Sequence, residues 1–349
     1  MNPRMLTAAR DAQGLTQKEL GDACGIAQSS ISKAENGTRP LTEDELKRVA
    51  ERLGVTTDLL SWPDDVYGFG SASFFHRKQQ SLSQKTLRRI QAQVNFLRMR
   101  VQRLSQGVEI DASMTIPHLD PDGAGGPEEV ARRLRAAWRL PIGPVGNVVN
   151  AIENAGGVIV RHDFETHRIN AISVWHPGSP PLFVVNSTLT PEQQRFVLAH
   201  ELGHMVMHEG EPPREEAERE ADRFAGEFLM PATDVASDLR EIDLKKAATL
   251  KPYWKVSMQS LILRAEHLGI ISPGRCRSLH AYMNKLGYLP IEPLPVPREN
   301  PTVLTEIVQV HLDEHEYTSD ELARVLGMPR SQFINEFTPR RNRMLKAVN

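Results

Sequence analysis

The residues with the clearest chemical potential lie in the segment FVLAHELGHMVMH at positions 196–208. His200 and His204 are four residues apart, so on a helix their imidazoles project from one face and can share a metal ion. Glu201, directly after His200, is placed to take a proton from a water molecule activated by that metal. This HExxH arrangement indicates metal-assisted hydrolysis, with Zn²⁺ as the expected cofactor and Glu201 as the general base.

A catalytic zinc site needs a third protein ligand. The next helical pattern, EEAEREADRFAGEFLMP at 215–231, offers two carboxylates for this role. Glu218 can bind the metal while Asp222, four residues further on the same face, orients a ligand histidine from behind. Glu220 is the competing ligand. We favour Glu218 because only it has an aspartate four residues on.

Other polar residues could support the chemistry. His208 continues the stripe of His200 and His204, and we expect it to form a local hydrogen bond or pack rather than bind zinc. A hydrolase of this kind also needs a donor for the developing oxyanion. Tyr253, His267 and His280 are candidates, and their types and positions in the sequence leave the choice between them open.

The N-terminal segment GLTQKELGDACGIAQSSISKAENG at 14–37 has the spacing of two short helices joined by a turn. Thr16 and Glu19 form a capping box, and Gly25 supplies the turn. The second helix exposes a small, polar face of the kind that reads the major groove of DNA, made of Gln28, Ser29, Ser30, Ser32 and Lys33. This pattern predicts a double-stranded DNA operator as a partner; the alternative is a helix-turn-helix used only for protein contacts.

The elements that must position these residues can be read from periodicity. Short strands are predicted at 156–164, 169–176 and 180–186, followed by helices at 191–208 and 214–229. An edge strand near the metal-binding helix could pair with an extended substrate backbone. The expected fold is α+β and mostly helical: an all-α helix-turn-helix bundle at 1–62, a basic helical linker at 63–127, a central domain with a small sheet at 128–250, and a helical region at 251–349.

The linker has a marked charge asymmetry. From Phe74 to Gln106 there is no Asp or Glu, while apolar residues recur at helical spacing from Leu87 to Leu104. The segment is therefore expected to form an amphipathic helix that tracks phosphates or binds an acidic partner, with a solvated helix face as the alternative. Its basic residues are Arg77, Lys78, Lys85, Arg88, Arg89, Arg98, Arg100 and Arg103.

The C-terminal region contains TSDELARVLGMPRSQFINEF at 318–337, which predicts either a packed helical hairpin or a second helix-turn-helix, and the hairpin is favoured. A basic tail, RRNRMLKAVN, follows at 340–349.

Composition excludes several classes of protein. The chain has 349 residues, a net charge of −2 and two cysteines. Two cysteines exclude a disulfide framework and a four-cysteine metal site within the chain. The apolar runs fall far short of the ~20 residues of a membrane helix, and the first residues lack a signal-peptide core. We therefore expect a cytoplasmic protein without a membrane partner.

The segment 14–37, together with RVAERLGVTTDLL at 48–60, resembles the Xre/Cro family of helix-turn-helix repressors. This resemblance implies that Gln17 contacts phosphate and that Gln28, Ser29, Ser30 and Lys33 reach base edges or the DNA backbone. Since acidic and basic residues roughly balance in this segment, tight binding would need a homodimer or help from the linker.

Residues from about 130 to 275 resemble the ImmA/IrrE family of zinc metallopeptidases. The resemblance rests on Asn186 and on the segments AHELGHMVMH, EADRFAGEFLMP and KPYWKVSMQSLILRAEHLGII. It implies a zincin-like fold of the gluzincin type, with His200, His204 and Glu218 as zinc ligands and Glu201 as base. It also implies cleavage of a helix-turn-helix repressor, which relieves repression of stress or mobile-element genes.

Together these patterns predict a transcriptional regulator with an embedded zinc endopeptidase that cleaves a helix-turn-helix repressor, or itself, in response to stress. The alternative is a DNA-binding metal or effector sensor, or an antitoxin-like repressor with a toxin partner, whose peptidase-like domain does not turn over.

Overall fold

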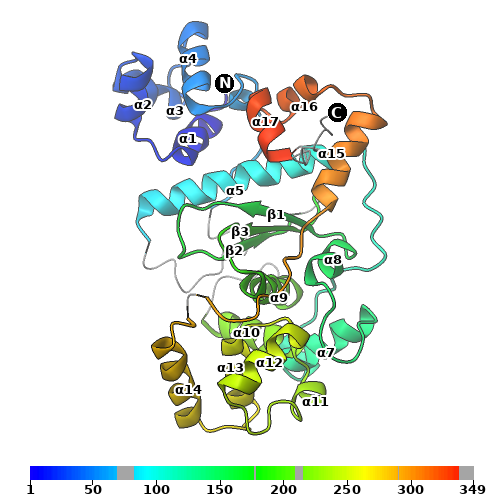
Figure 1. The fold of residues 1–349 in the computed structure, drawn as a ribbon. Coiled ribbons are helices and arrows are strands. Elements are labelled where there is room, and N and C mark those ends of the chain that lie inside the picture. The colour runs from blue at the N-terminus through cyan, green and yellow to red at the C-terminus, as the bar shows by residue number, and fades with distance from the viewer. Residues whose placement is uncertain (69–81, 177, 209–214, 290, 338–349) are drawn as a thin grey trace, which may run out of the picture.

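The computed structural model describes the chain except residues 69–81, 177, 209–214, 290 and 338–349. It confirms the predicted fold class, mostly helical with a small mixed sheet in the central region. A long helix, α5, runs between the N-terminal helices and the sheet (Figure 1). The helices that follow the sheet, α9 to α14, lie on its other face, and the last three, α15 to α17, lie on the same side of the sheet as α5. Within the described residues, no helix combines the length and the apolar character needed to cross a bilayer.

The N-terminal bundle forms because each of its turns is specified locally. Thr16 and Glu19 make the predicted capping box, and Gly25 ends the second helix with a φ of +63° that favours glycine. Leu20, Ile31 and Leu53 are fully or almost fully buried in its core. Its elements are α1 (Pro3–Ala12), α2 (Gln17–Cys24), α3 (Gln28–Glu35), α4 (Glu43–Leu53) and a 3₁₀ turn, η1 (Leu59–Ser61).

Helix α5 (Gln84–Leu104) has two buried faces. Phe96 and Met99 join the core of the N-terminal bundle, while Val94 and Val101 pack with the sheet. A helix enclosed in this way has little surface left for a ligand. The amphipathic helix is therefore present, but it separates two layers of the protein.

The basic residues of α5 serve mainly as internal contacts, so the predicted phosphate-tracking surface is wrong for most of them. Arg98 donates to the backbone oxygen of Asp65, and Arg100 donates to that of Leu326. Arg103 pairs with Asp64, and Arg89 pairs with Glu165. Lys85 and Arg88 are exposed, while Arg77, Lys78 and the tail at 340–349 lie outside the described residues.

The sheet has three strands in the order β1-β3-β2. All three form within the predicted segments: β1 (Val158–His162), β2 (Ala171–Val174) and β3 (Leu182–Asn186). Strand β3 pairs in parallel with β1 and antiparallel with β2, with Ile172 opposite Val184. The strand closest in sequence to the metal-binding helix, β3, is therefore central, and β1 and β2 are the two edge strands of this sheet.

Because side chains alternate along the strands, one face of the sheet packs against α5 and the other packs against α9. Ile172 and Val184 belong to the core shared with α5. Ala171 and Val185 belong to the larger core on the opposite face, together with Leu198. Since successive side chains point to opposite faces, Ser173 lies on the same face as Ala171.

The larger core is built by helices below the sheet. Helix α9 (Pro191–Met207) packs closely against α10 (Glu215–Leu229), because Gly203 lets the ring of Phe224 approach its backbone. The other helices of this layer are α6 (Pro121–Ala124), α7 (Pro127–Ala137), α8 (Val148–Glu153), α11 (Ala232–Val235), α12 (Leu244–Trp254), α13 (Met258–His267) and α14 (Pro273–Lys285).

The chain then returns from α14 to the top of the molecule. On the way, Glu299 forms a buried ion pair with Arg195 of α9. The last helices are α15 (Val303–Asp313), α16 (Ser319–Val325) and α17 (Arg330–Phe337). The segment 318–337 is a hairpin packed against α5 and the N-terminal bundle, where Thr56 N donates to Gly327 O. This favours the packed-hairpin interpretation over a second helix-turn-helix.

Candidate metal centre and nucleic-acid interface

The two histidines of the HExxH segment lie on α9, and local interactions fix where this helix begins. Thr190 and Gln193 form a capping box at its start, and Pro191 occupies the first turn. His200 and His204 are both buried. The helix therefore presents their rings to the interior at a defined position.

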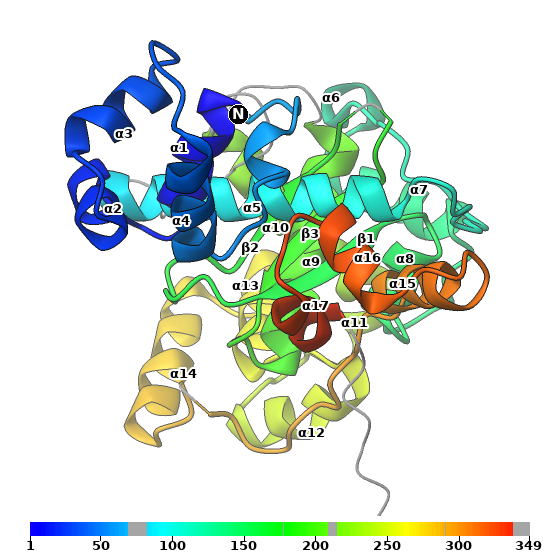
Figure 2. The same cartoon turned by 90° about the horizontal axis from the view of Figure 1, so that it is seen from above.

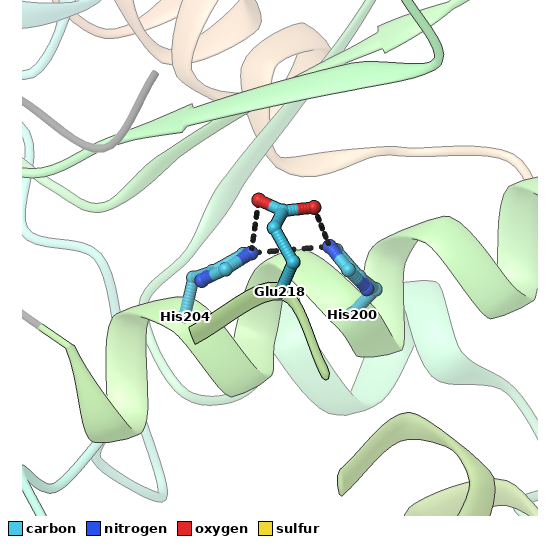
Figure 3. A group of neighbouring side chains, drawn as sticks. All are labelled: His200, His204 and Glu218. Atoms are coloured by element: carbon cyan, nitrogen blue, oxygen red, sulfur yellow. Dashed lines mark hydrogen bonds and ion pairs between the residues drawn. The ribbon is translucent and has the colours of Figure 1, made fainter. Parts of the chain in front are cut away.

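Helix α10 brings a carboxylate to this pair. Glu218 Oε1 lies 3.4 Å from His204 Nε2, and Glu218 Oε2 lies 3.7 Å from His200 Nε2. Figure 3 shows the carboxylate of Glu218 facing both rings. The ligand atoms of the three residues all lie within 4.8 Å of one another, which makes this group a possible metal site.

Hydrogen bonds to the Nδ1 atoms of His200 and His204 orient both imidazoles so that their Nε2 atoms face Glu218. His200 Nδ1 donates to Asp222 Oδ1 at 2.9 Å. His208 Nε2 donates to Glu220 Oε2 at 2.8 Å, so His208 Nδ1 can accept a hydrogen bond from His204 Nδ1 at 3.1 Å. With their Nδ1 atoms donating, both ligand histidines present the lone pair of Nε2 to Glu218.

These residues fit a metal ion. The two Nε2 atoms are 3.1 Å apart, a short approach for two lone pairs unless a cation lies between them. Glu218 Oε1 is buried and accepts no hydrogen bond from the described residues. Two imidazoles and one carboxylate form the ligand set of one class of catalytic zinc sites.

Among the described residues, the possible metal-binding group consists of His200, His204 and Glu218, whereas Glu220 accepts a hydrogen bond from His208. The Glu220–His208 contact behind His204 was not predicted. Its signal in the sequence is the repeat of histidines at four-residue spacing, 200, 204 and 208, which continues one helical face.

Glu201 is almost completely buried beside this group. Its Oε2 accepts a hydrogen bond of 2.6 Å from the hydroxyl of Ser173 on the edge strand β2. Burial raises the pKa of the Glu201 carboxyl to about 7, although the nearby His200 and the Ser173 hydrogen bond act to lower it. A carboxyl with a pKa in this range can both take and return a proton near neutral pH.

Ser173 was missed because no local motif marks it. The alternation of β2 could have shown that it faces α9, but only once the layers of the fold were known. The three candidate oxyanion donors lie elsewhere. Tyr253 is exposed on α12, His280 contacts Cys276 on α14, and His267 lines a surface cavity with Asp222.

The second candidate site is the outer face of α3. Gln28, Ser29 and Lys33 are exposed and Ser30 is half-buried. Helices α2 and α3 lie at the periphery of the molecule, away from the sheet (Figure 2). The face that would read DNA is therefore open to solvent in this structure.

A hydrogen-bond network holds the two glutamines of this face. Glu35 accepts hydrogen bonds from Arg10 and from Gln17 Nε2, the latter at 2.9 Å. Gln17 Oε1 in turn accepts from Gln28 Nε2 at 2.8 Å. The network fixes side chains that would otherwise lose rotamer freedom on binding.

Comparison with known proteins agrees with both sites. No curated protein matches the sequence of this chain. Residues 6–60, which span the N-terminal bundle, match the helix-turn-helix family model. Residues 152–266, which contain the sheet, α9 and α10, match the M78 peptidase model, described as the IrrE N-terminal-like domain. The chain thus joins an Xre-type helix-turn-helix domain to an IrrE N-terminal-like domain of the M78 peptidase family.

Proposed function

We propose that this protein is a DNA-binding regulator whose central domain is a zinc-dependent endopeptidase. The observation that carries the proposal is the convergence of His200, His204 and Glu218 beside the buried Glu201. In this proposal His200, His204 and Glu218 are the zinc ligands and Asp222 orients His200.

Zinc held there would polarise a peptide carbonyl and favour ionisation of the attacking water. Glu201 takes a proton from that water and passes it to the leaving amine. Ser173 fixes the orientation of the Glu201 carboxylate through its hydrogen bond. The outer edge of β2, beside the same serine, offers an extended substrate a backbone to pair with, because β2 pairs only with β3 in the described sheet.

The regulatory part of the proposal rests on the helix-turn-helix domain. Gln17, Gln28, Ser29, Ser30 and Lys33 contact an operator in double-stranded DNA. The bundle carries no strong excess of positive charge, and most arginines of α5 are engaged internally, so we propose a homodimer that doubles the contacts with DNA. The protein substrate is a helix-turn-helix repressor or the chain itself, cleaved under stress.

Metal content is the first test. Elemental analysis of the purified full chain should find near-stoichiometric zinc in the wild type and little in His204→Ala. Absence of metal from both proteins, even after zinc is added, would rule out the peptidase proposal.

Turnover is tested separately with Glu201→Gln, which keeps all three ligands and removes the base. Wild-type protein should cleave a co-encoded helix-turn-helix repressor or its own chain, as seen by mass spectrometry, and Glu201→Gln should not. If Glu201→Gln retains full regulation of its operator in cells, the alternative gains support: a metal or effector sensor, or an antitoxin-like repressor, without turnover.

A further inference from the structure

A cavity of about 340 Å³ opens beside the N-terminal half of α9. Part of its wall comes from α9 itself, with Gln193, Phe196 and Val197. Asn170, directly before β2, and Ser257, directly before α13, lie across from them. None of these residues has a role in the proposed chemistry so far.

The cavity is continuous with the metal-binding face of α9. Gln193, Val197, His200 and His204 follow one another at intervals of four, three and four residues, so they form one stripe along the helix. Val197 therefore lies about one helical turn before His200, and Gln193 lies about two turns, roughly 10.5 Å, before it.

The edge strand β2 links the cavity to the proposed general base. Asn170 precedes β2, and three residues later Ser173 contacts Glu201. A substrate strand paired with β2 and cut beside Glu201 would extend over the cavity. At about 3.3 Å per residue, the two helical turns between Gln193 and His200 correspond to about three residues of such a strand.

The polar groups that line the cavity are suited to an uncharged partner. The side chain of Asn170 and Nε2 of Gln193 make no hydrogen bond with any described residue, although Gln193 Oε1 accepts one from Thr190 N. The carboxylate in the lining, Glu192, is buried and paired with Lys251. Phe196 and Val197 add an apolar wall for the stem of a side chain.

We propose that this cavity is the specificity pocket of the peptidase and takes the amide side chain of a glutamine or asparagine about three residues from the cleaved bond. The inference rests on the proposed function. Asn170 and Gln193 can exchange hydrogen bonds with a substrate amide, which satisfies donors and acceptors on both sides. A lysine or arginine side chain would lose hydration there without gaining a counter-ion, because the carboxylate of Glu192 is already paired with Lys251.

The test uses the zinc-loaded full chain and a peptide library in which each position is fixed in turn as Gln, Asn, Glu, Lys or Leu. Binding is measured with Glu201→Gln protein, and cleavage with the wild type. We expect selection of Gln or Asn at one position by about 10-fold over Glu and Lys, the factor that corresponds to one buried hydrogen bond.

Gln193→Glu is the diagnostic variant, because glutamate also completes a capping box with Thr190 and the helix start should survive. It should shift selection at that position toward Lys. Gln309→Glu is the matched control: it makes the same change at an exposed position on α15 and should leave the selection unaltered.

The outcomes separate the two proposals. Peptide binding without amide selection, or selection that Gln193→Glu does not move, overturns the specificity pocket even if cleavage depends on Glu201. Amide selection in binding, without any Glu201-dependent cleavage, upholds the pocket as a peptide site and overturns the peptidase function.

Discussion

Replacing Gly203 with alanine should disturb the metal centre without touching a ligand. Gly203 lies next to His204 on α9, where α10 crosses closely. A Cβ atom added there would lie 2.8 Å from Phe224 Cδ1 and 3.1 Å from Phe224 Cγ. Phe224 is fully buried and its ring stacks on Phe228, so the ring cannot turn away freely. The added methyl group therefore pushes α10, which carries Glu218, away from the histidines.

The expected change in the free energy of unfolding follows from two opposing effects. Alanine in place of glycine inside a helix gains up to about 1 kcal/mol of helix propensity. Overpacking a well-filled core costs about 1–3 kcal/mol. The free energy of unfolding of Gly203→Ala should therefore fall by about 0–2 kcal/mol relative to the wild type. Zinc affinity should fall by about 10-fold or more, as when the groups that orient metal ligands are disturbed.

Gly226→Ala on α10 is the matched control. There an added Cβ atom meets only the Arg264 side chain, at 3.7 Å from Nη1 and 4.0 Å from Cδ, which are ordinary contacts, so the propensity gain should remain. The two variants should differ in stability by about 1–3 kcal/mol, which corresponds to about 1–4 °C in melting temperature for a chain of 349 residues.

Thermal unfolding of the metal-free proteins measures the stability difference, and competition with a chromophoric chelator measures zinc affinity. If Gly203→Ala matched Gly226→Ala in melting temperature and bound zinc as tightly as the wild type, the close packing of α9 on α10 would not set the position of Glu218. The reasoning would then be refuted.

Four further results are expected. Glu220→Gln removes the carboxylate that holds His208, so zinc affinity measured by chelator competition should fall by about 10–100-fold. Glu299→Ala leaves the buried Arg195 guanidinium without its partner and should cost about 3–5 kcal/mol in urea unfolding, while replacing both residues with methionine should restore much of the loss. Zinc at 100 times its dissociation constant should stabilise the folded chain by about 2.7 kcal/mol, a gain that a chelator abolishes in calorimetry. Lys33→Ala should reduce the slope of log affinity for DNA against log salt by about 1, as measured by fluorescence anisotropy; an unchanged slope would place Lys33 away from the phosphates.

Much of the candidate site follows from short-range patterns. The four-residue spacing of His200 and His204 puts both rings on one helical face whatever the rest of the chain does. Thr16, Glu19 and Gly25 specify the first turn of the helix-turn-helix through backbone hydrogen bonds and a positive φ. The three strands are short, β-branched and bounded by turn residues, so their composition and flanking residues located them.

Contacts between elements distant in sequence depended on tertiary packing. Glu218 and Glu220 are both carboxylates on one helix, and the rotation of α10 against α9 decides which one faces the histidines. Ser173 meets Glu201 because β2 is an edge strand over α9, an order that its sequence does not encode locally.

The basic segment also shows which features follow from local sequence and which depend on tertiary packing. Its helical periodicity was evident from the apolar spacing, but the environment of its arginines was not. Because α5 is enclosed between the N-terminal bundle and the sheet, Arg98, Arg100 and Arg103 find backbone oxygens and Asp64 in place of phosphates. Local periodicity determines that a helix forms. The surfaces packed around it decide whether its charges bind a ligand or hold the fold together.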